Sequence, residues 1–182
     1  MTWRRMGGMI AARCRGHEMA QRSAGLLIFR RRGGAIEVLL VHPGGPYWRN
    51  KDAGTWQISK GLIEPGEDAV SAARREAGEE LGVAIAGDAA PLGEIRQAGG
   101  KIVEAFAIEA DIDPAAVHSN SFEMEWPPRS GRMRSFPEVD AARWFGIDEA
   151  RGMMLASQRE LLDRLSDVAA TLSSPARARS PR

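Results

Sequence analysis

The sequence predicts a mixed α/β fold in which one β-sheet is packed between helices. Apolar segments rich in β-forming residues alternate with two segments of helical period, at residues 68–81 and 148–172. Of the 182 residues, 43% are hydrophobic and 27% are charged, a balance that fits one globular domain with a sizeable core. We expect this domain to span residues 19–172.

The two ends of the chain differ in composition from this domain. Residues 1–18 are rich in Arg, Gly and Met and lack the long apolar segment of a secretory signal. We expect them to be disordered, or to be an extension upstream of a natural start at Met19; a basic targeting peptide is an alternative. Residues 173–182 alternate Ser, Pro, Ala and Arg, which predicts a disordered basic tail.

Composition also excludes several classes of protein. The net charge is +1, whereas a nucleic-acid-binding domain is strongly basic, so no stable nucleic-acid partner is expected. The longest apolar runs, such as residues 24–29, are far shorter than the roughly 20 residues of a membrane span. Cys14 is the only cysteine, which rules out an internal disulfide and suits a reducing compartment. We therefore expect a cytoplasmic monomer or homodimer with no membrane partner.

The first two strands are expected to form a hairpin. Apolar segments at residues 23–31 and 36–42 flank Gly33 and Gly34, which are turn residues. Arg30 lies near this turn and is a candidate for binding substrate phosphates; a solvent-exposed turn is the alternative.

A long loop is expected at residues 42–61, with an unusual density of aromatic side chains. Loops of this length in compact domains are usually functional or disordered, and aromatic residues argue against disorder. Tyr47, Trp48 and Trp56 are candidates for stacking on a nucleobase. For Trp56 the alternative is a place in the core beneath the loop. The position of His42 at the end of a strand indicates a structural role rather than a catalytic one.

Residues 68–81 have the apolar spacing of a helix that Gly82 would end. A second face of this helix carries three carboxylates, at Glu76, Glu79 and Glu80. Like charges at these spacings repel, and no lysine lies among them. A hard divalent cation would turn the repulsion into coordination, because Mg²⁺ and Mn²⁺ prefer oxygen ligands. The alternative is a solvated acidic face.

The rest of the chain is expected to contribute strands, a loop and a helix. Strands are predicted at residues 91–97 and 101–110, and Glu104 shares a face with apolar residues of its strand. Residues 111–139 are expected to be a second long loop whose arginines, Arg134 among them, could close over a polyphosphate. A short strand then leads to a helix from an N-cap at Asp148 to about residue 172.

The spacing of the acidic segment resembles the signature of the Nudix hydrolases. Gly61 is followed by five residues, Glu67, seven residues and then REAGEELGV at residues 75–83. Ala77 is the one departure, because the family usually has a larger aliphatic residue there. The segment WFGIDEA also resembles the usual ending of these proteins, so the resemblance covers roughly residues 23–167.

This resemblance implies an α/β/α Nudix sandwich with a metal site on the helix. Mg²⁺ or Mn²⁺ would be held by the three glutamates and the carbonyl oxygen of Gly61, while Glu67 and Arg75 fix the loop against the helix. Glu79 or Glu80 would activate water. A further metal ligand is implied at Glu138, six residues before Trp144, with Glu123 and Glu125 as rivals. Lys60, directly before Gly61, would place its ammonium group beside the substrate phosphates.

The implied reaction is metal-dependent hydrolysis of a nucleoside diphosphate linked to another group. The residues SKG and LIEPGE resemble the branch of diadenosine tetraphosphate hydrolases and nucleoside triphosphate pyrophosphohydrolases. We therefore expect a nucleotide or dinucleotide polyphosphate as substrate. The alternatives are another diphosphate, such as a nucleotide sugar, a cofactor or an RNA cap, and a nucleotide-sensing module without catalysis.

Overall fold

The computed structural model describes residues 22–172, so the expectations for residues 1–18 and 173–182 fall outside the described residues. The central strand is β1 (Arg22–Arg32), which pairs antiparallel with β2 (Ala35–Pro43) and, near its start, with β3 (Ser59–Leu62). Its other edge pairs in parallel with β5 (Ile102–Glu109). The expected first hairpin is therefore confirmed, whereas β3 begins inside the segment at residues 42–61 that the sequence predicts as a loop.

The sheet is completed by two edge strands. β4 (Ala89–Arg96) pairs antiparallel with β5, and β8 (Val139–Gly146) pairs antiparallel with β2, which gives the order β4-β5-β1-β2-β8 with β3 beside β1. One parallel pair among antiparallel ones makes this a mixed sheet, as the sequence predicts. The chain reverses between β4 and β5 through a short 3₁₀ turn at residues 98–100.

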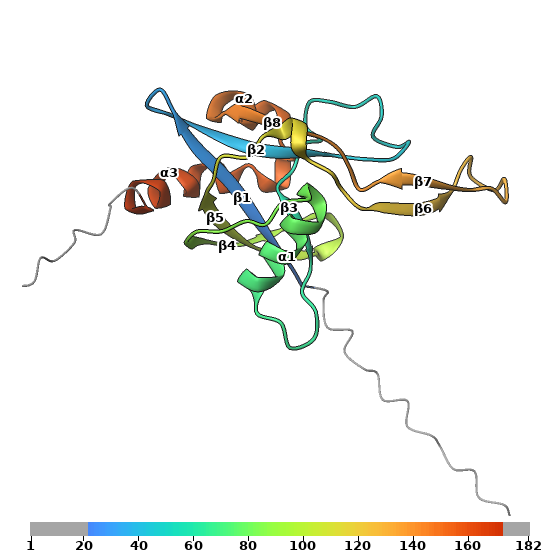
Figure 1. Cartoon of the computed structure of the whole chain (residues 1–182), viewed down its shortest axis with the longest axis horizontal. Helices are drawn as coiled ribbons and strands as arrows, with labels where there is room; N and C mark the ends of the chain where they lie inside the picture. Colours follow the sequence, from blue (N-terminus) through green and yellow to red (C-terminus); the bar gives the residue numbers. More distant parts are fainter. Residues whose placement is uncertain (1–21, 173–182) are drawn as a thin grey trace, which may run out of the picture.

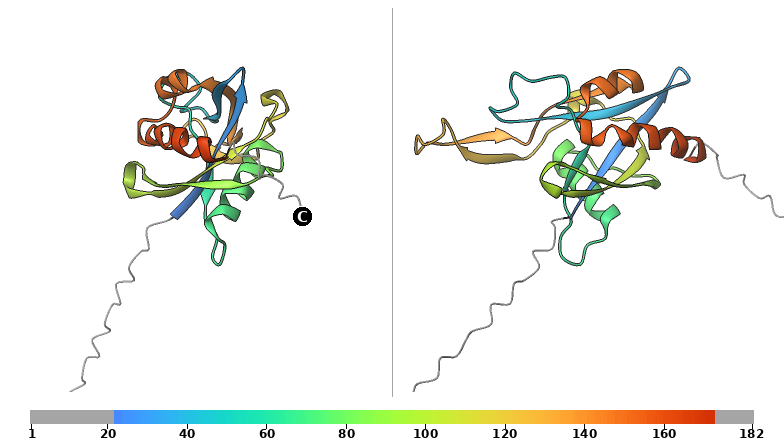
Figure 2. Two further views of the ribbon diagram at one scale, coloured as in Figure 1. Left: turned by 90° about the vertical axis from the view of Figure 1, so that its left-hand side faces the viewer. Right: turned by 180° about the vertical axis from the view of Figure 1, so that it is seen from behind.

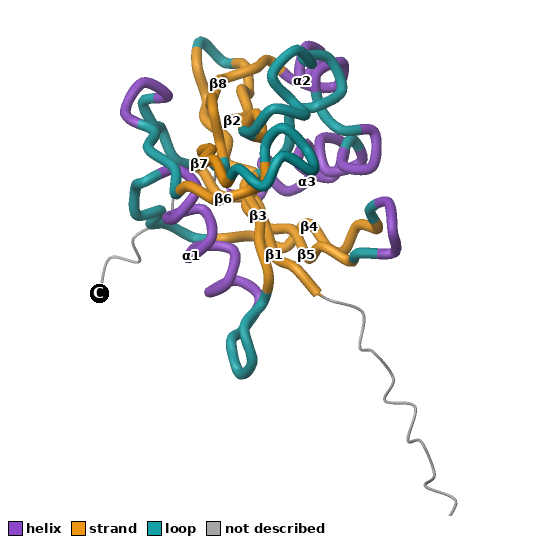
Figure 3. The backbone as a smooth tube through the Cα atoms, turned by 90° about the vertical axis from the view of Figure 1, so that its right-hand side faces the viewer, coloured by secondary structure: helices purple, strands orange, loops and turns teal. Residues whose placement is uncertain are grey.

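Helices cover both faces of the sheet (Figures 1 and 3). α1 (Ala69–Leu81) packs on one face, where Ala73, Ala77 and Leu81 are fully buried against Ala24, Leu26 and Ile28 of β1. α2 (Ile147–Met153) and α3 (Glu160–Leu172) pack on the other face against alternate residues of β1, including Leu27 and Phe29. Side chains alternate between the faces of a strand, so β1 serves both cores.

The predicted second helix is interrupted, and it begins at Ile147 after Gly146 rather than after a cap at Asp148. The interruption follows Met153, where the chain pairs with the loop before β3. The Trp56 N–H donates to the Met153 carbonyl, and the Leu155 N–H donates to the Trp56 carbonyl. These backbone groups bond to the loop instead of continuing a helix.

The predicted loop at residues 111–139 contains a two-stranded sheet of its own. β6 (Ser121–Glu125) and β7 (Met133–Pro137) pair antiparallel, and the hairpin extends away from the central sheet (Figures 1 and 2). Short 3₁₀ turns lie at residues 114–116 and 156–158. No helix within residues 22–172 is long and apolar enough to cross a membrane.

Candidate active site

Gly61 of β3 lies directly against the acidic face of α1. It is paired with Ala24 of β1, a residue that faces α1. A Cβ atom added to Gly61 would lie 1.8 Å from Oε2 of Glu76 and 1.9 Å from its Cδ. No other side chain fits unless the carboxylate moves, so β3 and α1 bring the Glu76 carboxylate onto the backbone of Gly61.

Arg75 ties the loop before α1 to the helix itself. Its guanidinium donates to both carboxylate oxygens of Glu67 at 3.0 Å, and to the Leu62 carbonyl at 2.9 Å. The same group reaches Glu76 at 2.9 Å and Glu79 at 3.4 Å. Hydrogen bonds from Arg75 hold the pKa of Glu67 below its usual value, and those from Arg75 to Glu67 raise the pKa of the guanidinium. Arg75 thus contacts the residue with which the family resemblance pairs it, and the role of this pair in fixing the loop stays a prediction.

Glu80 occupies a largely enclosed place on the acidic face. Its Oε2 accepts a hydrogen bond of 3.2 Å from the Lys60 N–H, and burial raises the pKa of Glu80 to about 7. The Lys60 side chain leaves β3 on the face opposite to Gly61 and α1, because its Cβ packs towards Gly25 of β1. Burial lowers the pKa of the Lys60 ammonium, and attraction to Glu80 opposes this shift.

The donor atoms of this face fit a hard divalent cation, although the carboxylates are not gathered around one point. Within residues 22–172, no group of three Asp, Glu, His or Cys side chains is arranged to hold an ion. Arg75 lies between Glu76 and Glu79, and Glu80 turns to the backbone of β3. Glu79 is nearly half exposed, so its carboxylate can turn without disturbing the core. Carboxylates and a backbone carbonyl are the ligands that Mg²⁺ and Mn²⁺ prefer.

Glu138 is held near the end of α1 by a short series of backbone hydrogen bonds. The His118 N–H donates to the Leu81 carbonyl, and two residues further on the Asn120 carbonyl accepts from the Glu138 N–H. Glu138 in turn accepts from the Gly44 N–H at the end of β2. Of its rivals, Glu125 accepts from the Gly131 N–H in the tip of the hairpin. These contacts fix the backbone of Glu138 near the end of α1, and its role as the outside carboxylate stays a prediction.

Two of the predicted substrate contacts are corrected by the structure. Trp56 is only 6% exposed and packs edge-on against Phe145, so it belongs to the core and cannot stack on a base. Its Nε1–H donates to Asp52. Arg30 lies six residues along β1 from Ala24, about 20 Å away at the rise of a strand. There it forms ion pairs with Glu37 and Asp111, which leaves it no place near Gly61.

Other polar candidates of the sequence have structural partners. His42 is buried, with Nδ1 2.7 Å from Asp140 and Nε2 2.8 Å from the Lys51 carbonyl, which fits the expected structural role. Glu104 pairs with Arg22 at 3.3 Å. Its position opposite Ala24 places it on the α1 side of the sheet.

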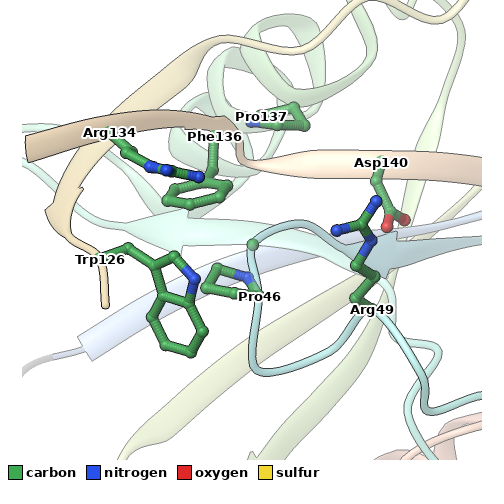
Figure 4. A pocket seen from close by; sticks show the side chains of 8 residues that line it. Pro46, Arg49, Trp126, Arg134, Phe136, Pro137 and Asp140 are labelled. Atoms are coloured by element: carbon green, nitrogen blue, oxygen red, sulfur yellow. The ribbon is translucent and has the colours of Figure 1, made fainter. Parts of the chain in front are cut away.

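The remaining aromatic candidates lie beside a pocket of about 300 Å³. Tyr47 is 56% exposed and packs edge-on against Trp126, while Trp48 lies against the Lys51 ammonium. The pocket lies between residues 45–49 and the β6–β7 hairpin (Figure 4). Sequence reasoning names Arg134 but misses Trp126 and Phe136. Aromatic residues near arginines in one segment are the signal that could have found them.

The fold and the acidic face together define a Nudix hydrolase, and the chain belongs to this family: the NUDIX domain model matches residues 19–165. It is thus a pyrophosphohydrolase acting on acid anhydrides that contain phosphorus. The chain is 32% identical over 142 residues to the pig asymmetrical bis(5'-nucleosyl)-tetraphosphatase. This match covers 72% of the present chain and 83% of the pig protein.

Solved structures share the fold at lower sequence identity. A Caenorhabditis elegans Ap4A hydrolase in a binary complex has a TM-score of 0.60 and 23% identity, covering 82% of this chain and 98% of that one. The NUDIX domain of Shewanella oneidensis NrtR, in complex with ADP ribose, has a TM-score of 0.58 and 16% identity, and the match covers 82% of this chain and 88% of that one.

Proposed function

We propose that the protein hydrolyses a phosphoanhydride bond in a nucleoside polyphosphate, with diadenosine tetraphosphate or a nucleoside triphosphate as the first candidates, and that it does so with a divalent metal in the cytoplasm. The observation that carries the proposal is the Glu76 carboxylate held on the backbone of Gly61, with Glu80 enclosed beside it. The pig tetraphosphatase, at 32% identity, supports the choice of substrate.

The roles of the side chains follow from their surroundings. Mg²⁺ or Mn²⁺ would be held by Glu76, Glu79, Glu80 and the Gly61 carbonyl, with Glu138 from outside the helix. Such an ion offsets negative charge on the phosphates and lowers the pKa of a water bound to it. Arg75 and Glu67 keep the loop and helix in register. Glu80, enclosed beside the backbone of β3, or the more exposed Glu79 would accept a proton from the attacking water.

The reaction can be tested by chromatography of products from a panel of substrates. The protein is incubated with Mg²⁺ or Mn²⁺ and with diadenosine tetraphosphate, nucleoside triphosphates, nucleotide sugars and capped RNA. We expect diadenosine tetraphosphate to yield AMP and ATP, and EDTA to abolish turnover. Glu80→Gln should lower turnover by orders of magnitude, whereas Glu64→Gln, an exposed glutamate of the preceding loop, should not.

The outcomes separate the alternatives that the sequence leaves open. Cleavage confined to a nucleotide sugar or a cap would overturn the choice of substrate but keep the reaction. Metal-dependent binding of nucleotides without any turnover would instead identify a sensing module. For the outside ligand, Glu138→Gln should weaken activation by Mg²⁺, while Glu123→Gln, exposed on the hairpin, serves as the matched control.

A further inference from the structure

A pocket lies between two segments that are far apart in the sequence. One wall is formed by residues 45–49, and the other by the β6–β7 hairpin and the start of β8 (Figure 4). Two glycines permit this approach. A Cβ atom on Gly44 would lie 1.9 Å from the Pro137 carbonyl oxygen, and one on Gly45 would lie 3.2 Å from the ring of Phe122. The close contact of the two segments is therefore encoded in the sequence.

One end of the pocket is aromatic and rigidly supported. Trp126, Phe136 and Pro46 line it, and Figure 4 shows their rings turned towards a common space. Tyr47 packs against Trp126 with ring centroids 5.3 Å apart, and Phe122 lies 6.2 Å from Phe136. Supported aromatic faces of this kind are suited to stacking on a planar ligand.

The pocket also has an excess of positive charge. Arg49 and Arg134 both line it, and neither forms an ion pair with any described residue, whereas Arg75 and Arg151 are both paired. The only acidic lining residue is Asp140, and His42 already lies 2.7 Å from its Oδ1. Two guanidinium groups without a carboxylate partner in a concave site favour an anion, above all a phosphate.

The pocket is placed to hold one part of a substrate whose reacting end lies at α1. Glu138 lies between Pro137 and Asp140 in the sequence, next to the first and two residues before the second, and both of these residues line the pocket; residues 118–120 connect Glu138 to the end of α1. A volume of about 300 Å³ is at the lower end of the range for small-molecule sites, so it suits one nucleoside phosphate rather than a whole dinucleotide.

We propose that this pocket binds the nucleobase and the adjacent 5'-phosphate of the substrate, with the base on Trp126 and Phe136 and the phosphate at Arg134 and Arg49. The proposal rests on the proposed function, since it assigns the site that recognises one nucleoside of that substrate. The rest of the polyphosphate chain then extends past Glu138 towards Glu76 and Glu80.

The first test measures binding without turnover, by titration calorimetry of the full chain with AMP and with ribose 5-phosphate. AMP should bind more tightly, because only AMP carries a base. Trp126→Ala should weaken AMP binding by about 5- to 150-fold, the range for the loss of one stacked base, and leave ribose 5-phosphate unaffected. Arg134→Gln should weaken the binding of both AMP and ribose 5-phosphate, because both carry the phosphate.

Matched controls lie on the opposite face of the same hairpin. Arg134 and Phe136 alternate with Met133, which is 60% exposed, and Ser135. Met133→Ala and Ser135→Ala should leave binding of AMP unchanged. Phe136→Leu keeps an apolar side chain against Phe122 while it removes the aromatic face, so it weakens AMP binding without unfolding the hairpin. Equal binding of the two ligands, or pocket variants that bind AMP like the wild type, would overturn the proposal.

Kinetics separate this proposal from the proposed function. In turnover, Trp126→Ala should raise KM and leave kcat within about twofold, because it removes binding shared by substrate and transition state. If AMP binds in the pocket but no polyphosphate is cleaved, the pocket assignment stands and the proposed function fails. If diadenosine tetraphosphate is cleaved with an unchanged KM in Trp126→Ala, the function stands and the pocket assignment fails.

Discussion

At Gly61 a neighbouring side chain, rather than a special backbone conformation, demands a glycine. The Glu76 carboxylate fills the space that a Cβ atom would take. A methyl group there can be accommodated only by moving the end of the Glu76 side chain, which is flexible. The contact therefore links the identity of residue 61 to the position of a candidate metal ligand rather than to the core.

Gly61→Ala should thus separate activity from stability. We expect the variant to fold, with a melting temperature within a few degrees of the wild type, and to lose most turnover because the Glu76 carboxylate is displaced. Gly152→Ala is the matched control, since nothing lies within 4 Å of its added Cβ, and should keep full activity. Near wild-type turnover in Gly61→Ala would show that this contact is not part of the active site.

Glu80 should make the metal-free protein less stable as the pH rises. Burial raises its pKa from 4.5 to about 7, so between these values the folded protein binds the proton more tightly than the unfolded chain. The free energy of unfolding then falls as the pH increases, by on the order of 3 kcal/mol across the window.

Urea unfolding in EDTA between pH 4.5 and 8 can measure this loss. Glu80→Gln removes the titrating group and should flatten the profile, so the variant is expected to be the more stable protein at pH 8 without metal. The same slope in wild type and variant would locate the pH dependence elsewhere.

The side chains of the acidic face could be predicted from sequence because they lie within one helix of known period. The pocket could not, since its walls come from residues 45–49 and 126–140, and no spacing rule joins segments so far apart. Aromatic composition alone also fails to distinguish Tyr47 from Trp56. Trp56 is buried because its backbone pairs with Met153 and Leu155. No local pattern in the sequence predicts this tertiary contact.

At the scale of elements, local signals decide what could be foreseen. α1 has an apolar stripe, an N-cap at Asp68 and a left-handed Gly82 at its end, and each of these is visible in the sequence. In the β6–β7 hairpin, β6 alternates polar and apolar side chains over SFEME, a signal of period two that the prediction of a loop did not use, whereas β7, with MRSFP, has no such alternation. The break between α2 and α3 likewise depends on backbone bonds to Trp56, in a loop distant in sequence.

The start of α1 offers a test of how firmly the helix is fixed. The Asp68 side chain accepts from the Ser71 N–H at 3.0 Å, and hydrogen bonding to the side chain and the backbone of Ser71 holds the pKa of Asp68 below its usual value. Asp68→Ala should lower the melting temperature by a few degrees, because the N-terminal N–H groups lose their acceptor. Asp68→Asn, which keeps an oxygen in place, should retain most of the stability. Equal losses in the two variants would mean that charge, rather than the cap, matters.

At the scale of the molecule, the sheet divides the protein into two cores, and β1 belongs to both. The α1 core positions the acidic face, and the other core, with Phe29, Phe145 and Met154, anchors the loop that carries residues 45–49 through Trp56. The start of β1 pairs with β3 and β5 at once. Damage to this strand should therefore affect both cores and the candidate active site together.

Shortening the chain from its first residue tests this dependence. The family match begins at residue 19, and β1 begins at Arg22. A chain that begins at Met19 should keep its turnover and melt within about 2 °C of the full chain, a shift that corresponds to about 0.5–1 kcal/mol. A chain that begins at Gly25 loses the residues of β1 that pair with Leu62, Gly61 and Glu104, and should fail to fold. A marked loss already in the first truncation, by calorimetry or by product analysis, would show that residues 1–18 contribute to the domain.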